Sequence, residues 1–353
     1  MLAHYFFRLL LAAAIFIAAN FFSTFPALAD DLSINAKAAI LIDGETGQVY
    51  YAKDADKSRS PASLTKLMTA IVAVENGNLD DVVEITGRAA SVSVGSTIGL
   101  NKGDRITLDN LLKAALVSSA NDSTVAIAEH VGGSHDAFLY QMNRKAFLIG
   151  ALDTKYVNTN GYYDPKHYST AYDLGLIARY ALQKPRIREL VSTKETVVKW
   201  EKPKKEKEVK NTNRLLFSGE VKGIKGIKTG STARAGNCLI ASASQGDKHF
   251  IAVLLHAGNR YREAVKLLEY GFEQVKPVVI FPAGKKLGEV AVRNGMENKV
   301  TVTVADPVRV NIARDQLKNI KVSAKQMILS SYAYYIIYFQ IHIDNLKNIS
   351  SKS

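Results

Sequence analysis

Cysteine is almost absent from this sequence, which has only one, Cys238, among 353 residues. A single thiol cannot form an internal disulfide, so a disulfide-stapled fold is excluded and the core must hold together without cross-links. Cys238 lies beside the apolar run 239–243 and has no histidine arranged to activate it, which favours a buried structural thiol over a catalytic one. Proline is also scarce and no periodic repeat is present, which excludes fibrous and repeat proteins.

Acidic residues are in the minority, with 33 Asp and Glu against 46 Lys and Arg, so the formal net charge is +13. This surplus favours a polyanionic neighbourhood such as a cell wall or an acidic membrane surface, although it also serves plain solubility. With 47% apolar and 22% charged residues, the composition excludes global disorder, and the length favours two domains.

Charged residues are missing from the N-terminus, where Arg8 is the only Lys, Arg, Asp or Glu before Asp30. Residues 9–22 are almost wholly apolar, and Ala27-Leu28-Ala29 matches a small-residue cleavage site. This pattern predicts a signal peptide over residues 1–29, so the mature protein would be exported with a net charge of +12 once Arg8 is removed. An uncleaved anchor is the alternative, although an apolar core of about 14 residues is short for a bilayer span.

Hydrophobic periodicity predicts the elements of the main domain. Residues 38–43 and 48–52 flank a Gly-Glu-Thr-Gly turn and predict a β-hairpin. The charged stretch 197–209, in which Lys is interleaved with Glu, is expected to be a solvated loop between strands. Further strands are predicted over 239–244 and 250–255, and helices over 63–74, 107–117, 122–130, 135–148, 170–182 (closed by Pro185) and 262–274. The order of these elements predicts an α+β fold, in which an antiparallel sheet is flanked by helices.

The composition of the sequence changes after Pro277, where short segments rich in β-branched residues are separated by Gly, Asn and Pro. A domain boundary near residue 275 follows. We therefore expect a signal peptide, a main domain, a small β-rich C-terminal domain and an atypical hydrophobic tail, over residues 1–29, 30–275, 276–322 and 323–353.

The first chemical motif is Ser63-Leu64-Thr65-Lys66, the only Ser-x-x-Lys in the chain, at the start of a predicted helix. A spacing of three places the hydroxyl and the amine on the same helix face, and the helix N-terminus directs N–H groups and positive dipole towards Ser63. The lysine would have to lose about three pKa units to act as a base at neutral pH, which costs about 4 kcal/mol. A dry site with a second cation nearby can lower the pKa in this way. The motif predicts a serine nucleophile with a lysine partner, and a surface pair is the alternative.

Two further motifs carry polar groups suited to a substrate. Ser119 and Asn121 lie two residues apart between predicted helices, where the hydroxyl can pass a proton and the amide can fix a substrate carbonyl or the lysine. A helix cap at Asn121 is the alternative. The segment Lys228-Thr229-Gly230-Ser231 puts a cation and hydroxyls on a predicted edge strand beside a glycine, which predicts a carboxylate-binding site. An edge lysine that guards against aggregation is the alternative there.

Together, and in this order, the three motifs are the signature of penicillin-binding proteins and class A β-lactamases. The chain closely resembles the low-molecular-mass penicillin-binding proteins that are D-alanyl-D-alanine carboxypeptidases, over roughly residues 35–320. The segments that carry the resemblance are Arg59 to Thr69, Asn121-Asp122, Ala128-Glu129-His130, Asn160-Gly161, His167 to Ala171, Asn211-Thr212-Asn213 and Gly226 to Thr232.

The resemblance implies the DD-peptidase/β-lactamase fold and an acyl-enzyme reaction on peptidoglycan stem peptides. It implies that Ser63 attacks the carbonyl between the two terminal D-alanines and that Lys66 activates Ser63. Ser119 would relay the proton to the leaving amine, and Asn121 would orient the acyl chain. The enzyme would act outside the cytoplasm, at the cell wall or the outer face of the cytoplasmic membrane.

The same resemblance implies that Lys228 and Thr229 hold the terminal carboxylate of the substrate, with Arg262 adding positive charge. Gly230 and Ser231 would belong to the same binding strand, and the backbone N–H of Ser231 would form an oxyanion hole with that of the nucleophile. β-Lactam antibiotics would be covalent inhibitors. No metal or organic cofactor would be required, and nucleic acid is not expected as a partner.

Two other functions are alternatives to the carboxypeptidase. A class A-like β-lactamase needs a carboxylate that activates a deacylating water, and no such Glu is identifiable from a local motif, whereas residues 277–321 resemble the carboxypeptidase β domain. A non-catalytic cell-wall binding protein is the second alternative, but the intact serines and lysines of the three motifs argue against it. The chain has no His-Glu-x-x-His and no Gly-x-Ser-x-Gly, so zinc peptidases and α/β-hydrolases are excluded.

The resemblance fades after Lys321, so the second domain is expected to be incomplete. Residues 327–343 are apolar and aromatic and contain no Lys, Arg, Asp or Glu. One hypothesis is a frameshifted or truncated reading, since the tail is rich in residues that A/T-rich codons specify. The other is a hydrophobic anchor that makes peripheral membrane contact, since about 17 residues reach the lower edge of a span and Tyr suits the interface.

Overall fold

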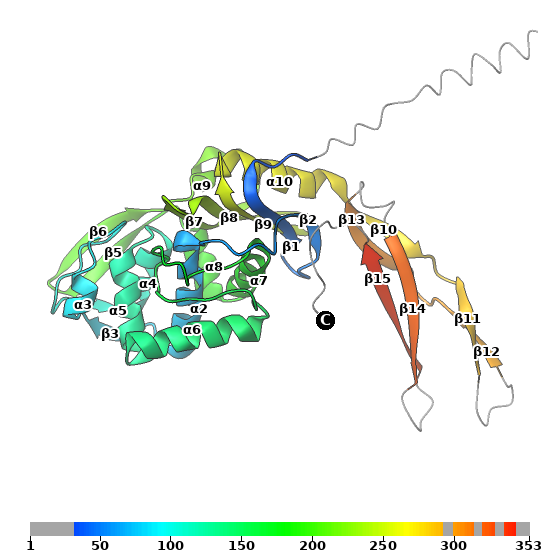
Figure 1. Cartoon of the computed structure of the whole chain (residues 1–353), viewed down its shortest axis with the longest axis horizontal. Coiled ribbons are helices and arrows are strands. Elements are labelled where there is room, and N and C mark those ends of the chain that lie inside the picture. Colours follow the sequence, from blue (N-terminus) through cyan, green and yellow to red (C-terminus); the bar gives the residue numbers. More distant parts are fainter. Residues whose placement is uncertain (1–31, 292–298, 314–319, 329–334, 344–353) are drawn as a thin grey trace, which may run out of the picture. The chain divides into compact units, whose positions relative to one another are not determined.

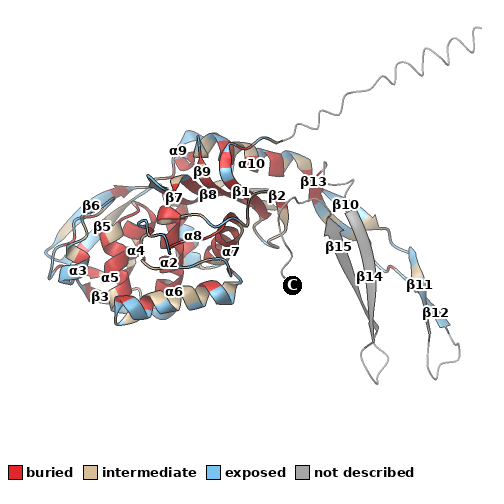
Figure 2. Cartoon of the chain, viewed as in Figure 1, coloured by how far each residue is buried: buried red, intermediate tan, exposed pale blue. Residues whose placement is uncertain are grey.

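The computed structural model describes four stretches of the chain, residues 32–291, 299–313, 320–328 and 335–343. The expected signal peptide over 1–29 lies outside the described residues, and the account that follows concerns the unit that begins at Ile34. Its largest body of buried side chains lies among a five-stranded sheet and the helices around it (Figure 1 and Figure 2).

The central sheet is antiparallel throughout, with the strand order β2-β1-β9-β8-β7. The predicted N-terminal hairpin and the two predicted apolar strands, β8 and β9, are confirmed. β1 pairs with β9 from the far end of the domain, so that Ile40 lies opposite Val253, and β7 is left at one edge. The bounds are β1 (Ala36–Asp43), β2 (Val49–Lys53), β7 (Ile224–Thr232), β8 (Gly236–Gln245) and β9 (Lys248–Ala257).

Helices cover both faces of this sheet. A Cβ added to Gly175 of α7 (Ala171–Leu182) would lie 3.2 Å from Ile42, whereas one added to Gly271 of α10 (Arg260–Gln274) would lie 3.1 Å from Leu41. Neighbouring residues of a strand point to opposite faces, so α7 and α10 pack on opposite sides of β1. The predicted α+β architecture, an antiparallel sheet flanked by helices, is therefore confirmed.

The other long helices pack around α2, on the α7 side of the sheet (Figure 1). The long helices α4, α6 and α7 each begin where a hydroxyl caps them: the side chains of Thr107, Ser134 and Thr170 accept a backbone N–H from the first turn of α4, α6 and α7 respectively. The bounds are α2 (Lys66–Asn76), α4 (Leu108–Leu116), α5 (Asn121–Gly132), α6 (His135–Ile149) and α8 (Pro185–Ser192).

Two helix boundaries differ from the sequence prediction. Pro185 follows the end of α7, as predicted, but it is also the first residue of a further helix, α8, where its missing N–H is not needed. Residues Ala62–Thr65 form a 3₁₀ turn, η1, and the α-helix begins only at Lys66. Ser63 therefore lies in a tight turn just before α2, and this turn packs against β7.

The charged stretch 197–209 is not the expected solvated loop. It forms most of a hairpin of β5 (Glu195–Lys202) and β6 (Lys205–Lys210) in a sheet of order β3-β4-β5-β6. The buried side chains of Val198 and Trp200 alternate with charged residues, so the charges mark only the outer face of the strands. Short elements complete this part, namely β3 (Val82–Glu84), α3 (Gly87–Ala90), β4 (Arg105–Thr107) and α9 (Leu215–Ser218).

The described residues after 275 form strands that pair two by two, β10 with β13, β11 with β12 and β14 with β15. The β-rich character predicted for this region is confirmed, whereas the division into domains stays a prediction. The expected boundary at 322 falls inside β14, and the described residues of the hydrophobic stretch 327–343 lie at the end of β14 and in β15. In the described parts of the chain, no helix is long and apolar enough to cross a membrane. The bounds are β10 (Val275–Phe281), β11 (Lys286–Ala291), β12 (Lys299–Thr303), β13 (Val308–Ala313), β14 (Ile320–Ile328) and β15 (Tyr335–Ile343).

Candidate active site

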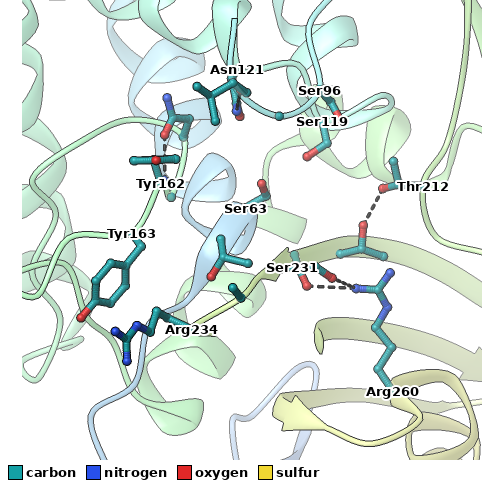
Figure 3. A pocket seen from close by; sticks show the side chains of 18 residues that line it. Ser63, Ser96, Ser119, Asn121, Tyr162, Tyr163, Thr212, Ser231, Arg234 and Arg260 are labelled. Carbon is teal, nitrogen blue, oxygen red and sulfur yellow. Dashed lines mark hydrogen bonds between the residues drawn. The ribbon is translucent and has the colours of Figure 1, made fainter. Parts of the chain in front are cut away.

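A pocket of about 540 Å³ opens where η1, the start of α5, and β7 meet. Figure 3 shows Ser63, Ser119 and Ser231 around this pocket, each contributed by one of the three sequence motifs. The fold thus brings the motifs together. The pocket is lined by Ser63, Val94, Gly95, Ser96, Ser119, Asn121, Asn160, Gly161, Tyr162, Tyr163, Thr212, Thr229, Gly230, Ser231, Thr232, Ala233, Arg234 and Arg260.

The turn that carries Ser63 is held in an unusual backbone conformation. Ala62, just before Ser63, has a φ of 48°, a left-handed value that is rare for a residue with a side chain. A Cβ added to Gly161 would lie 1.8 Å from the carbonyl oxygen of Ala62, and Gly161 itself has a φ of 84°. Only glycine fits there, so the segment around Gly161 packs its backbone directly against the turn and fixes it.

Lys66 lies beneath Ser63 and is completely buried. Its Nζ lies 2.8 Å from Ser63 Oγ and donates to the carbonyl oxygen of Asn160 at 2.9 Å. Burial lowers the pKa of the Lys66 amine well below its usual range and the charge of Lys228 lowers it further, whereas Asp122 acts in the opposite direction. In its uncharged form this amine has a lone pair that can accept the proton of the Ser63 hydroxyl.

Ser119 lies between α4 and α5, Asn121 is the first residue of α5, and both line the pocket. Ser119 has a φ of 65°, a second left-handed residue beside the site. Asn121 Nδ2 donates to the carbonyl oxygen of Val94 at 2.6 Å, and the N-cap of α5 is Ala120, which makes no side-chain cap bond. The alternative of a helix cap at Asn121 is therefore wrong, because its amide fixes the pocket wall.

Asp122 supports the same wall, a role that the sequence did not reveal. Its carboxylate accepts the backbone N–H groups of Ile98, Gly99 and Leu100 at 3.0 to 3.2 Å. Together with Asn121, it fixes the loop that carries Val94 into the pocket. Because Asp122 is buried, its negative charge also acts on Lys66 with little screening by solvent.

The predicted binding strand is β7, and it runs along the pocket at the edge of the sheet. Lys228 is buried and donates to the carbonyl oxygen of Thr229 at 3.1 Å. Burial, and then the charge of Arg260, lower the pKa of Lys228 to about 7. A Cβ added to Gly230 would lie 2.9 Å from the backbone nitrogen of Ser63, so glycine at this position allows β7 to approach the nucleophile turn.

Arg262 does not lie in the pocket, so the prediction for this residue was wrong. Its Nε donates to the carboxylate of Glu263 at 3.2 Å, and its side chain is 63% exposed. Arg260 takes the expected place instead and donates to the carbonyl oxygen of Gly230 at 2.9 Å and to the Ser231 hydroxyl at 2.8 Å. The two arginines lie in the first turn of one helix, and only the direction of each side chain separates them, which sequence spacing alone did not reveal.

Other pocket residues come from segments to which the sequence gave no role. Thr212 lies beside β7, with its Oγ1 2.6 Å from Thr229 Oγ1. Tyr162 and Tyr163 follow Gly161, and Arg234 lies in the turn after β7. In the sequence, only the family resemblance marks the segments Asn160-Gly161 and Asn211-Thr212-Asn213. Cys238 is buried and burial raises its pKa to about 11, as expected of a structural thiol.

The described part of the chain contains no group of three or more His, Cys, Asp or Glu residues that could hold a metal ion. The groups at this site are a hydroxyl beside a buried amine, a second hydroxyl, an amide and a cationic strand edge. This set can deliver a nucleophile to a carbonyl carbon and hold a carboxylate beside it.

Comparison with known proteins gives one consistent family. The family model described as D-alanyl-D-alanine carboxypeptidase matches residues 25–259. The chain is 33% identical over 288 residues to D-alanyl-D-alanine carboxypeptidase DacF of Bacillus subtilis, covering 79% of this chain and 73% of that protein. It is 34% identical over 305 residues to D-alanyl-D-alanine carboxypeptidase DacC of Escherichia coli, covering 82% of this chain and 74% of that protein.

Solved structures show the same likeness. The D-alanyl-D-alanine carboxypeptidase DacD from Francisella tularensis superposes with a TM-score of 0.71 at 27% identity, covering 89% of this chain and 91% of that chain. Penicillin binding protein 5 from Haemophilus influenzae gives a TM-score of 0.71 at 26% identity, covering 90% of this chain and 95% of that one.

Proposed function

The chain belongs to the D-alanyl-D-alanine carboxypeptidase family of serine peptidases, and we propose that it removes the terminal D-alanine from peptidoglycan stem peptides through an acyl-enzyme on Ser63. One observation carries the assignment of the nucleophile. Ser63 Oγ lies 2.8 Å from the amine of Lys66, which is completely buried and has a strongly lowered pKa.

The first step is acylation. As Ser63 Oγ attacks the carbonyl carbon of the scissile bond, its proton passes to the neutral Nζ of Lys66. Negative charge then develops on the carbonyl oxygen, and the backbone N–H groups of Ser63 and Ser231 bind it, each contributing about 3 kcal/mol in comparable hydrolases. The close approach at Gly230 supports this placement, because it brings the backbone of β7 next to the nitrogen of Ser63.

The bond between the carbonyl carbon and the nitrogen of the terminal D-alanine breaks next. The leaving nitrogen needs a proton, and the Ser119 hydroxyl, which lines the same pocket, relays one from the protonated Lys66. D-Alanine departs, and a water molecule then attacks the ester, donates a proton back through Lys66 and releases the shortened peptide. Each proton transfer is assigned to a protein group or to water, so we expect the reaction to need no metal or organic cofactor.

Two sets of residues hold the substrate in place. Lys228, Thr229 and Arg260 supply the charges and the hydroxyl for the terminal carboxylate, and the hydrogen bonds of Arg260 along β7 and β8 keep it beside that strand. Asn121 orients the acyl chain on the opposite wall, since one of its amide N–H groups is used by Val94 and its other polar groups remain available to a peptide.

A β-lactamase is disfavoured by the composition of the pocket. None of the described residues that line it is Asp or Glu, so no carboxylate in the lining is placed to activate a deacylating water. Penicillin is therefore expected to acylate Ser63 and to stay bound. A non-catalytic binding protein is disfavoured by the buried amine of Lys66, because burying a lysine is costly and its placement beside Ser63 has a use only in chemistry.

We also propose that the enzyme acts outside the cytoplasm, where peptidoglycan is located, after export directed by residues 1–29. A peripheral membrane contact through residues 323–353 belongs to the same proposal, since Tyr and apolar residues are concentrated there. Membrane fractionation of the protein with and without residues 324–353 tests the contact. Equal partition of the two forms would contradict it.

The function itself is tested with the purified mature chain. We expect a fluorescent penicillin to label the protein, mass spectrometry to locate the adduct on Ser63, and a peptide ending in D-Ala-D-Ala to release D-alanine. Ser63→Ala is the matched control and should lose both activities. Rapid penicillin turnover would indicate a β-lactamase, and neither labelling nor D-alanine release would indicate a binding protein.

A further inference from the structure

A second cation lies at the mouth of the pocket, away from the residues assigned to the reaction. Arg234 is exposed in the turn between β7 and β8, and its guanidinium lies 5.9 Å from the ring centroid of Tyr163. Figure 3 shows Arg234 and Tyr163 side by side at the rim. Tyr163 and its neighbour Tyr162 are 42% and 57% exposed, so this rim offers aromatic surface next to a positive charge.

The two arginines of the pocket differ in how their donors are used. Arg260 is occupied by the protein, since it donates to the carbonyl oxygen of Gly230, the Ser231 hydroxyl and Tyr261. The guanidinium of Arg234 has no hydrogen bond or ion pair to any residue that the structure describes. Arg234 therefore keeps its full fork of N–H donors for a ligand, while stacking on Tyr163 limits its motion.

The direction of β7 decides which part of the substrate meets Arg234. If the terminal carboxylate lies at Thr229 and the scissile carbonyl at the N–H of Ser231, the substrate runs antiparallel to β7. Its acyl part then continues past Thr232 towards the turn that holds Arg234. Three residues of extended chain span about 10 Å, so a group about two residues upstream of the scissile alanine reaches the rim.

The charge of the pocket also fits an anion at this end. Arg234 and Arg260 are the charged residues among its described lining, and none of these lining residues is acidic. One terminal carboxylate is matched by Arg260 together with Lys228 below it. Arg234 has no counterion among the residues that the structure describes, so a second carboxylate would be attracted to it.

We propose that Arg234 and Tyr163 form an acyl-side subsite that binds a carboxylate of the stem peptide two residues upstream of the scissile alanine. In a stem peptide this position is a γ-linked D-glutamate, whose α-carboxylate is either free or amidated. The enzyme then prefers stems with the free carboxylate over stems with the amide. This subsite rests on the proposed function, because the direction of the substrate follows from it.

A matched pair of peptides tests the subsite. L-Ala-γ-D-Glu-L-Lys-D-Ala-D-Ala and its D-isoglutamine form differ only in a carboxylate against a carboxamide. At low salt, we expect wild-type kcat/KM to be about five-fold higher for the carboxylate peptide, which is the upper range for a solvent-exposed charge pair. The preference should fall as NaCl is raised, since salt screens exposed charges.

Variants then locate the preference. Arg234→Gln should bring the ratio of the two kcat/KM values close to one, and Arg234→Glu should reverse it. Arg144→Gln is the matched control: Arg144 is an exposed arginine of α6 that does not line the pocket, and its loss changes the net charge equally, so the ratio should stay as in wild type. A wild-type ratio near one, or a ratio unchanged by Arg234→Gln, would overturn the subsite. If wild type released D-alanine from neither peptide, the proposed function itself would fail.

Discussion

Thr65 Oγ1 lies 2.8 Å from His167 Nε2. This contact joins the turn that carries Ser63 to the segment 157–167, in which the carbonyl oxygen of Asn160 accepts from Lys66. The other ring nitrogen of His167, Nδ1, accepts the backbone N–H of Val157 at 3.2 Å. Nε2 therefore carries the proton in the neutral ring and donates it to Thr65, whose own hydroxyl donates to the carbonyl oxygen of Ala62 at 2.8 Å. The neutral imidazole thus links the turn that carries Ser63 to Val157, in the segment whose Asn160 carbonyl accepts from Lys66.

Acid should destabilise the protein through His167. Burial lowers the pKa of His167 to about 4, although Asp164 acts in the opposite direction. In the unfolded chain the ring has a pKa near 6.5, so between these values the unfolded state binds more protons and the stability falls as the pH falls. The loss from this group amounts to about 3 kcal/mol between pH 7 and pH 4.

Urea unfolding at pH 7 and at pH 4 measures this loss. Wild type should lose about 3 kcal/mol more than His167→Gln over the interval, because glutamine does not titrate. Equal losses for the two proteins would show that His167 is not the group responsible.

Removal of the Lys66 amine should stop acylation at the chemical step. Lys66→Ala leaves Ser63 without its proton acceptor, so we expect the rate of penicillin acylation to fall by about 10³-fold. Stopped-flow labelling with a fluorescent penicillin measures the rate. Lys225→Ala, which removes an exposed lysine of β7 that does not line the pocket, is the control and should acylate at the wild-type rate. If Lys66→Ala were acylated at the wild-type rate, Lys66 would not be the base.

The rate constant for penicillin acylation should fall at alkaline pH because Lys228 loses its charge. With its pKa lowered to about 7, Lys228 is a cation below this pH and loses its charge as the pH rises through it. If the cation holds the carboxylate of the substrate, the second-order rate constant for penicillin acylation falls above pH 7, since this constant reports groups of the free enzyme. Lys228→Arg keeps the charge at every pH and should remove the fall. An identical alkaline limb in both proteins would assign it to another group.

Gly230→Ala should reduce acylation without unfolding the protein. The added Cβ would lie 2.9 Å from the Ser63 nitrogen and 3.0 Å from Ala62 Cβ, so the nucleophile turn or β7 must shift. A displacement near 1 Å costs about 100-fold in rate at a catalytic site, whereas overpacking costs about 1 to 3 kcal/mol of stability. Acylation rates and thermal unfolding measure the two effects. Gly87→Ala, where the added Cβ has its nearest neighbour at 3.8 Å, should leave acylation unchanged.

The sequence predicted the sheet and most of the helices because their signals are local. The Gly-Glu-Thr-Gly turn between β1 and β2 and the apolar runs of β8 and β9 are each visible within a short segment of sequence. The hairpin of β5 and β6 was missed because its charged outer face hid the alternation of Val198 and Trp200. The helix α8 was missed because Pro185 ends one helix and begins another equally well.

The site was predictable only where its groups lie close together in the sequence. Ser63 and Lys66 are three residues apart, and Ser119 and Asn121 two. The contact of His167 with Thr65 joins residues 102 positions apart, and no pattern within one segment reveals it. The sequence also could not separate Arg260 from Arg262, because these two arginines lie on one turn of helix and differ only in the directions of their side chains.

The position of β7 at the border of the central sheet determines the shape of molecule that this enzyme can accept. On its outer side β7 has no partner among the described strands of that sheet, so a peptide that lies there can add itself as a sixth strand. Main-chain groups then provide much of the affinity, whatever the side chains. Peptides that cannot straighten, such as small rings closed across the scissile bond, should therefore be poor ligands even when they carry the correct terminal carboxylate.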